Sequence, residues 1–278
     1  MNQAEDAAHE STSAGLRLGS ESHLDRHYYA LQQEYEDTLR KVGLQPGWRV
    51  LDAGSGNGLF LPLMSQLIGA TGEIHALDLA PEHVAAIAKS KSYACPVLPK
   101  VGNITALPYE ADRFDAVWSA NVSQYLTDEQ LLHSIREFGR VVKPGGLVAV
   151  KEVDISVWQF QPQDPHIMWR LLEGLKDDTQ MAGAQRGTRM PLWFREAGLA
   201  DIRCTTTLAE RRHPLKVVER DYIQGNLQFL ASLAKNVDLL VEDARQWAAI
   251  AEAPESLIAQ PDFCYRELYV LTCGQKPR

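Results

Sequence analysis

The 278-residue sequence predicts a doubly wound α/β fold built around a largely parallel sheet. Three observations lead to this prediction. Short apolar segments alternate with helical patterns, the first of these segments breaks into a run of glycines, and the second ends at an acidic residue about one βαβ unit further along the chain. Because parallel strands must be joined by crossover connections, this alternation is what a doubly wound sheet requires.

The elements of the first half follow one another at regular spacing. Residues 24–42 place Tyr28, Tyr35 and other apolar side chains on one helical face, and Gly43 ends the pattern. Strands are predicted at 49–53, 73–79, 97–101, 114–120 and 147–153, with helices at 59–68, 81–90 and about 131–142. The second half is less regular: residues 154–186 are expected to be helical in part, followed by a strand at 201–207, helices at 215–258 and a strand at 264–273.

The glycine run, Val50 to Gly58, reads as a strand that turns sharply and restarts as a helix. Glycine allows a backbone to turn tightly and to approach a ligand closely, and a helix N-terminus offers free N–H groups to a negative group. Asp78 ends the second strand, where an acid accepts hydrogen bonds from ribose hydroxyls in such folds. The sequence therefore predicts a nucleoside-containing ligand at the carboxyl edge of the sheet.

The spacing of the glycines distinguishes between nucleoside ligands. Leu59 stands where a dinucleotide fingerprint requires its third glycine, and no lysine follows the glycines as a Walker-A loop requires. Asp52, two residues before the first glycine, would face a cationic amine more comfortably than a pyrophosphate. Leu59 and Asp52 therefore disfavour a dinucleotide-dependent oxidoreductase, and the missing lysine disfavours a Walker-A nucleotide site.

Over roughly residues 45–155 the sequence resembles the class I S-adenosylmethionine-dependent methyltransferases, in their small-molecule, ubiquinone–menaquinone branch. The matching segments, in order, are 50–58, 75–79, 102–109, 114–118 and 138–146. The resemblance implies a Rossmann-like seven-stranded sheet whose last strand is antiparallel, with helical cap insertions. It divides the chain into a flexible tail (1–23), a cofactor-binding core with an N-terminal lid helix (24–153), a cap insertion (154–186), a core continuation (187–214), a helical cap (215–260) and a final core strand (261–278).

The resemblance also implies S-adenosylmethionine as cofactor and assigns roles by position. Asp52 and Gly54 would lie near its methionine moiety, Asp78 would bind the ribose, and Leu79 would stack beside the adenine. Tyr28 is a candidate lid residue, with plain packing as the alternative. The full set of implied cofactor-binding residues is Tyr28, Asp52, Gly54, Ser55, Gly56, Asp78, Leu79, Asn103, Ile104 and Asn121. No metal site is expected.

The catalytic side is less clear from the sequence. The cofactor supplies an electrophilic methyl group, so the protein mainly aligns the acceptor and excludes water. Small-molecule relatives often carry a pair of histidines just after strand four, but this sequence has no histidine there. Gln124 and Tyr125 occupy this segment and are candidate catalytic residues on the acceptor side. Either a base comes from the cap, where His166 and His213 are candidates, or the acceptor needs none at the methyl-transfer step, as a carbon acceptor would not.

These patterns predict a methyltransferase that acts on a small, largely apolar, secondary-metabolite-like acceptor, with carbon slightly favoured over oxygen as the attacking atom. Aromatic residues in the second half could line the acceptor pocket. One alternative is an enzyme of the methyltransferase fold that couples C-methylation of a prenyl, terpenoid or polyketide acceptor to ring closure. An alternative of another class is a nucleotide-binding oxidoreductase or a non-catalytic binding module.

Composition limits the partners. Twenty-eight lysines and arginines stand against 36 acidic residues, a net charge of −8, which disfavours nucleic acid and anionic membrane surfaces. Residues 1–23 lack the apolar region of a secretory signal, and the four cysteines are widely spaced, so a cytoplasmic location is expected. These patterns are compatible with a homo-oligomer.

Overall fold

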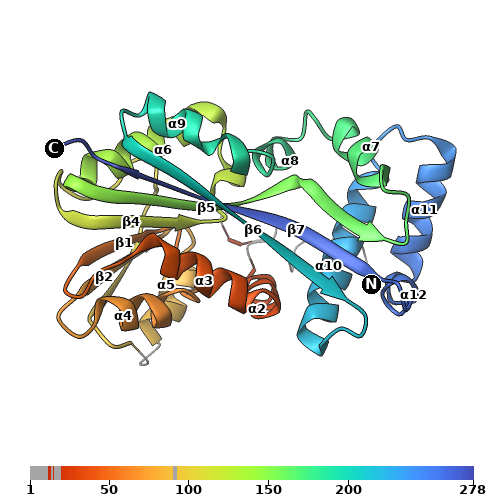
Figure 1. Cartoon of the computed structure of the whole chain (residues 1–278), viewed down its shortest axis with the longest axis horizontal. Coiled ribbons are helices and arrows are strands. Elements are labelled where there is room, and N and C mark those ends of the chain that lie inside the picture. Colours follow the sequence, from red (N-terminus) through yellow and green to blue (C-terminus); the bar gives the residue numbers. More distant parts are fainter. Residues whose placement is uncertain (1–11, 14, 16–19, 90–92) are drawn as a thin grey trace.

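The computed structural model describes residues 12, 13, 15, 20–89 and 93–278 (Figure 1). Most of the predicted tail lies outside the described residues. Where the structure describes it, the first helix, α2 (Glu21–Ala30), begins earlier than the expected Leu24 because Ser20 caps it by accepting a hydrogen bond from His23 N. The predicted single helix over 24–42 is divided at Leu31, whose φ of −126° and ψ of 18° separate α2 from α3 (Gln32–Val42).

A seven-stranded sheet in the order β3-β2-β1-β4-β5-β7-β6 forms the centre of the molecule. Strands β1 to β5 pair with one another in parallel, and β7 is antiparallel to both β5 and β6. The predicted seven-stranded sheet with an antiparallel last strand is confirmed. The strands are β1 (Arg49–Ala53), β2 (Glu73–Asp78), β3 (Val97–Val101), β4 (Phe114–Ala120), β5 (Val142–Gln161), β6 (Ala200–Arg212) and β7 (Cys264–Gln275).

Helices cover both faces of the parallel part of the sheet, as Figure 1 shows. Along β1, Val50 packs with one apolar cluster and Leu51 with another, because successive strand side chains point to opposite faces. Residues of α3, α4 (Leu61–Ile68) and α5 (Pro81–Lys89) contribute to the first cluster. Residues of α6 (Asp128–Val141) and α9 (Met190–Glu196) contribute to the second.

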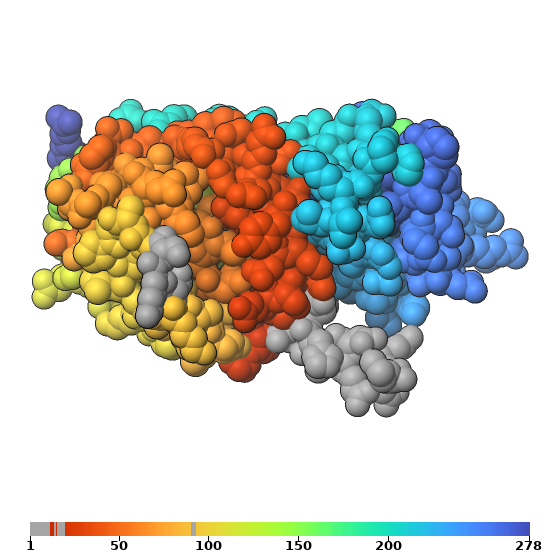
Figure 2. All heavy atoms as spheres, turned by 90° about the horizontal axis from the view of Figure 1, so that it is seen from below, coloured from red at the N-terminus to blue at the C-terminus, as the bar shows by residue number. Residues whose placement is uncertain are grey.

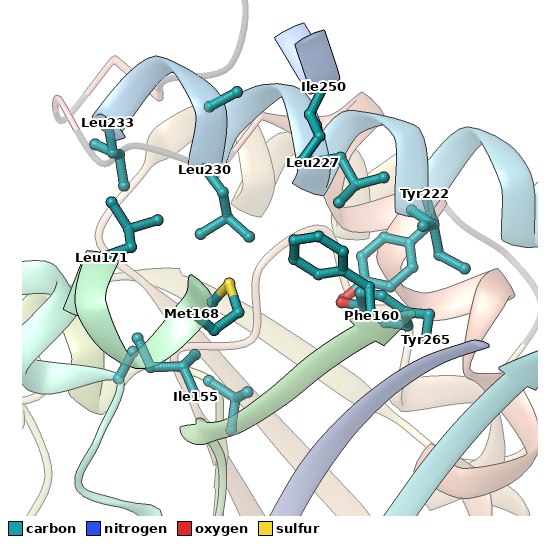
Figure 3. Packing of buried hydrophobic residues seen from close by; sticks show 14 of the residues in the cluster. Ile155, Phe160, Met168, Leu171, Tyr222, Leu227, Leu230, Leu233, Ile250 and Tyr265 are labelled. Carbon is teal, nitrogen blue, oxygen red and sulfur yellow. The ribbon is translucent and has the colours of Figure 1, made fainter. Parts of the chain in front are cut away.

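The cap is built on the sheet itself. We expected an insertion from residue 154, but β5 continues to Gln161 and pairs there with β7, Phe160 lying opposite Tyr265. The extended ends of β5, β6 and β7 carry a third apolar cluster, in which α10 (Val217–Ala234) packs over Phe160 of β5 and Leu171 of α7 (Ile167–Gly174) (Figure 3). The remaining cap elements are α8 (Thr179–Gly183), η2 (Gly187–Arg189), α11 (Val241–Glu252) and α12 (Pro254–Ile258).

The N-terminal helices lie between the core and the cap (Figure 2), where α2 packs against α10. Arg211 at the end of β6 fixes them there: its guanidinium donates to both carboxylate oxygens of Glu34, at 2.7 and 2.8 Å, and to the carbonyl oxygen of Ala30 at 2.8 Å. Among the described helices, none is both long and apolar enough to cross a membrane.

Candidate active site

A single pocket lies at the carboxyl ends of β1, β2 and β4 and continues beneath α2 to the cap helix α10. Its volume is about 320 Å³, at the lower end of the range of small-molecule sites, roughly 300 to 1,000 Å³. One side is formed by the glycine turn after β1 and the loops after β2 and β3. The other side is formed by α2, α3, the extended part of β5, α8 and α10.

The glycine turn has a conformation that other residues would not adopt. Gly54 has a φ of +83°, and a Cβ atom added to it would lie 2.4 Å from Cγ2 of Val122. The amides of Gly54 and Ser55 both donate to the carbonyl oxygen of Leu77, at 2.7 and 3.0 Å. Gly56 also has a positive φ, +53°. These constraints hold the turn open toward the pocket.

Asp78 is held at the end of β2 by three contacts. Its Oδ2 accepts a hydrogen bond from Gly56 N at 2.8 Å, and its Oδ1 accepts one from Ala80 N at 2.9 Å and lies 3.1 Å from Nδ1 of His83. The carboxylate therefore both organises the glycine turn and lines the pocket, where it can accept further hydrogen bonds.

Asp52 is 2% exposed and lines the same pocket. Its Oδ2 has no hydrogen-bond partner in the part of the chain that the structure describes. Burial, and secondarily the negative charge of Asp78, raise the pKa of Asp52 to about 8. A buried carboxyl group without a partner is costly, so this one suits a cationic ligand group that would bring the missing donor.

The other predicted cofactor-binding residues also line the pocket. Leu79 is 45% exposed, which leaves its side chain available for contact with a ligand ring. Asn103 is exposed and its Oδ1 accepts a hydrogen bond from Thr105 N at 2.9 Å, while Ile104 beside it is buried. Tyr28 lines the pocket and packs edge-on against Phe60, with ring centroids 5.3 Å apart.

Asn121, directly after β4, has a left-handed backbone with φ of +58°. Its side-chain oxygen accepts a hydrogen bond from Nζ of Lys151 at 2.7 Å, and its amide nitrogen donates to the hydroxyl of Tyr35 at 3.4 Å. Gln124 and Tyr125, in η1 (Ser123–Tyr125), line the pocket as well. Part of the Gln124 amide is already used, because its nitrogen donates to the carbonyl oxygen of Asn121 at 3.3 Å.

The two histidines predicted from the cap do not join this site. His166 is exposed before α7, where its ring lies 3.4 Å from a carboxylate oxygen of Asp164 and packs near Trp169. His213 is exposed after β6. Both belong to the cap, as expected, but neither faces the pocket. Their assignment as general bases is therefore corrected.

The structure brings further polar side chains into the pocket. His23 and His27 from α2, Tyr35 from α3 and Asn226 from α10 were not predicted to lie there, whereas Tyr222 of α10 is one of the aromatic residues expected to line the acceptor pocket. A histidine next to the apolar face of the helix predicted at 24–42 was the available signal for His27. No local sequence pattern indicates that α10 lies against this pocket.

The aromatic residues of the second half divide between the pocket and the core. Trp158, Tyr222 and Phe229 line the pocket. Phe160 packs in the cap cluster, Trp193 and Phe194 pack under the core sheet, and Trp169 is exposed. Within the described ranges, no group of three or more His, Cys, Asp or Glu side chains is arranged to hold a metal ion.

Comparison with known proteins agrees with this architecture. Residues 50–146 match the family model described as a methyltransferase domain. Demethylmenaquinone methyltransferases are similar to this chain. The enzyme of Lysinibacillus sphaericus is 30% identical over 125 residues, which cover 43% of this chain and 50% of the relative. The enzyme of Oceanobacillus iheyensis is 35% identical over 124 residues, which cover 42% of this chain and 49% of the relative. The chain thus spans about half the length of these curated relatives.

Solved structures extend the likeness to most of the chain, at the level of the fold. A methyltransferase described as putative from Bacillus halodurans superposes with a TM-score of 0.54 at 13% identity, covering 87% of this chain and 98% of its own. Phosphoethanolamine N-methyltransferase 2 of Haemonchus contortus, in complex with S-adenosyl-L-methionine, gives a TM-score of 0.54 at 14% identity, covering 92% and 57%.

The strand order, the glycine turn and Asp78 together define a nucleoside-binding domain of the methyltransferase fold. With the match over residues 50–146, the chain carries a class I S-adenosylmethionine-dependent methyltransferase domain, a class whose cofactor is S-adenosylmethionine. Its residues fit that cofactor, because Oδ2 of the buried Asp52, which has no partner among the described residues, could accept from a cationic amine, and Asp78 offers an acceptor to ribose hydroxyls.

Proposed function

We propose that this protein transfers a methyl group from S-adenosylmethionine to a small acceptor with a largely apolar body, of the quinone or secondary-metabolite kind. One observation carries the proposal: a single pocket joins the glycine turn and Asp78 to an aromatic surface supplied by the cap. The demethylmenaquinone methyltransferases among the relatives support an acceptor of this kind. Nucleic acid and membrane partners are not part of the proposal, in keeping with the net charge of −8.

In this proposal the two sides of the pocket have separate tasks. The glycine turn, Asp52, Asp78 and Leu79 would hold the cofactor, which supplies an electrophilic methyl group when bound. Trp158 and Phe229 would bury the apolar body of the acceptor. By packing α2 over the pocket, the chain would exclude water and keep the acceptor aligned.

The sequence favours carbon as the attacking atom, because no histidine lies directly after β4 to serve as a base. Since His23 and His27 line the pocket from α2, that reason no longer applies. Acceptors that lose a proton are therefore as well suited to the site as carbon acceptors that do not.

The test is methyl transfer by the full chain. Methyl-labelled S-adenosylmethionine is incubated with a panel that includes reduced demethylmenaquinone, substituted naphthols, fatty amines and a ribosomal RNA fragment. Label in one of the small apolar acceptors is the expected result, and magnetic resonance of the product identifies the methylated atom. Label in the RNA alone, or no binding of S-adenosylhomocysteine by calorimetry, would overturn the proposal.

The pH dependence of cofactor binding tests the role of Asp52. In the free protein this carboxyl is mostly protonated below its pKa of about 8. Pairing with a cationic amine favours the ionised form, so binding releases a proton and the affinity for S-adenosylhomocysteine should rise as the pH increases from 6 to 8. The rise is limited to about tenfold per pH unit. Asp52→Asn should flatten it, and calorimetry in buffers of different ionisation enthalpy counts the proton. An equal slope in both proteins would remove Asp52 from the amine site.

A further inference from the structure

A buried chain of hydrogen bonds borders the pocket beside the loop after β4. Nε2 of His27 and the hydroxyl of Tyr35 form a short hydrogen bond. The same hydroxyl accepts a hydrogen bond from the Asn121 amide at 3.4 Å, and Asn121 in turn accepts one from Lys151 at 2.7 Å. His27, Tyr35 and Asn121 all line the pocket. The chain of contacts therefore runs from an imidazole at the pocket wall to a buried ammonium group.

Lys151 fixes the inner end of this series of hydrogen bonds. Its side chain is fully buried, and its Nζ lies 3.7 Å from the centroid of the Tyr35 ring and 3.9 Å from that of Tyr269. Glu152 and Glu267 are its charge partners in the core. Since the aromatic faces and the carboxylates hold the ammonium group in place, Asn121 and Tyr35 are held as well.

The groups that face His27 come from three elements. Tyr35 contacts it through the hydrogen bond, and His23 on its own helix lies 5.9 Å away between ring centroids. From α10, the ring of Tyr222 stacks on it at 5.1 Å with an angle of 17° between the planes. Burial lowers the pKa of His27 well below its ordinary value, and the positive charge of Lys151 lowers it further. The imidazole of the free pocket is therefore neutral at neutral pH, and it would take up a proton only when the negative charge of an ionised acceptor group beside it raises its pKa.

We propose that His27, coupled to Tyr35, is the general base of this site and that the acceptor carries an acidic hydroxyl, phenolic or enolic, on an apolar body. This inference rests on the proposed methyl transfer. The proton of the acceptor hydroxyl passes to the imidazole, directly or as Tyr35 takes it and gives its own proton to Nε2. The acceptor oxygen uses the released electron pair to bond the methyl carbon, whose bond to sulfur breaks with its pair left on sulfur. The imidazolium then returns the proton to solvent.

Three other titratable groups of the pocket lie on its cofactor side. Asp52 and Asp78 lie at the glycine turn, on the cofactor side, and His83 contacts Asp78. His27 instead stacks on Tyr222 of the cap helix α10, and Trp158, Asn226 and Phe229 of the cap line the same pocket. An acceptor whose ring is buried among these cap residues can present its hydroxyl to His27 while its apolar part avoids water.

The test uses 4-nitrophenol as a probe, because its anion is yellow and its neutral form is not. The measurement is made with S-adenosylhomocysteine present and at a pH near the pKa of the free probe. The anionic fraction of 4-nitrophenol bound to the wild-type protein should then be larger than the anionic fraction of the probe in solution. His27→Gln keeps a hydrogen-bonding side chain but cannot take the proton, so the bound probe should lose most of this excess. Tyr35→Phe tests the coupling and should reduce it as well. His133→Gln, in an exposed histidine of α6, is the matched control and should behave as wild type.

Activity gives a second readout once an acceptor is identified. His27→Gln should lower kcat about a hundredfold, with the KM for S-adenosylmethionine changed less than about twofold. An unchanged anionic fraction in His27→Gln, with cofactor affinity retained, would overturn the assignment of the base and leave the proposed methyl transfer standing. Loss of S-adenosylhomocysteine binding by the wild-type protein would instead remove the proposed function itself.

Discussion

Replacing Asp78 with alanine is expected to weaken the binding of S-adenosylhomocysteine at least tenfold. The carboxylate lies at the end of β2, the position that accepts hydrogen bonds from ribose hydroxyls in this fold. Each hydrogen bond to a charged group is worth about 1.5 kcal/mol or more, and about 1.4 kcal/mol corresponds to a factor of ten in affinity. The same carboxylate accepts hydrogen bonds from Gly56 N and Ala80 N, so its loss also loosens the glycine turn.

Calorimetry on two variants separates these contributions. Asp78→Asn keeps the shape and one acceptor oxygen, so its loss of affinity should be smaller than that of Asp78→Ala. Glu110→Ala, which removes an exposed acid outside the pocket, is the control for a general change in charge. If Asp78→Ala bound S-adenosylhomocysteine as tightly as the wild type, the assignment of the ribose site would be wrong.

Replacing Arg186 with methionine is expected to destabilise the fold by about 3 kcal/mol and to disorder the loop after β4. This arginine is 6% exposed, and one of its terminal nitrogens donates to the carbonyl oxygens of Ser123 and Leu126, at 2.9 and 2.7 Å. Its other terminal nitrogen lies 2.6 Å from a carboxylate oxygen of Asp128. Each buried carbonyl left without a donor costs about 1 to 3 kcal/mol.

Thermal unfolding is the direct measurement. A loss of this size should lower the Tm by roughly 6 °C or more in a chain of this length. Arg189→Met is the matched control, because Arg189 is exposed yet its guanidinium, like that of Arg186, lies near the ring of Trp193. Equal shifts in the two variants would mean that the carbonyl contacts of Arg186 contribute little.

The cofactor side of the site was predictable because its signals are local. Gly54 and Gly56 need a positive φ, and only glycine adopts one freely, so their spacing marks the turn in any structural context. The alternation of apolar segments likewise predicts β1 to β4 to within one residue. For β1, β2 and β4 the reason is that parallel strands buried on both faces need nearly continuous apolar runs.

The cap was less predictable because its strand lengths depend on pairing. The run at 147–153 predicts a strand, but whether β5 continues to Gln161 is decided by β7 beside it and by the apolar cluster beneath α10. Strand propensity reflects such contacts more than the residues themselves. The expected insertion at residue 154 is therefore a continuation of the sheet.

The sequence alone determined the fold class and the cofactor-binding turn, because glycine conformation and apolar periodicity act over a few residues. Only the tertiary structure decided which histidine faces the pocket. His166 and His213 are exposed and do not line the pocket, whereas His27 is placed at the pocket wall by its hydrogen bond to Tyr35 and by stacking on Tyr222 of α10. That contact joins residues nearly two hundred positions apart, and packing brings them together where no local pattern could.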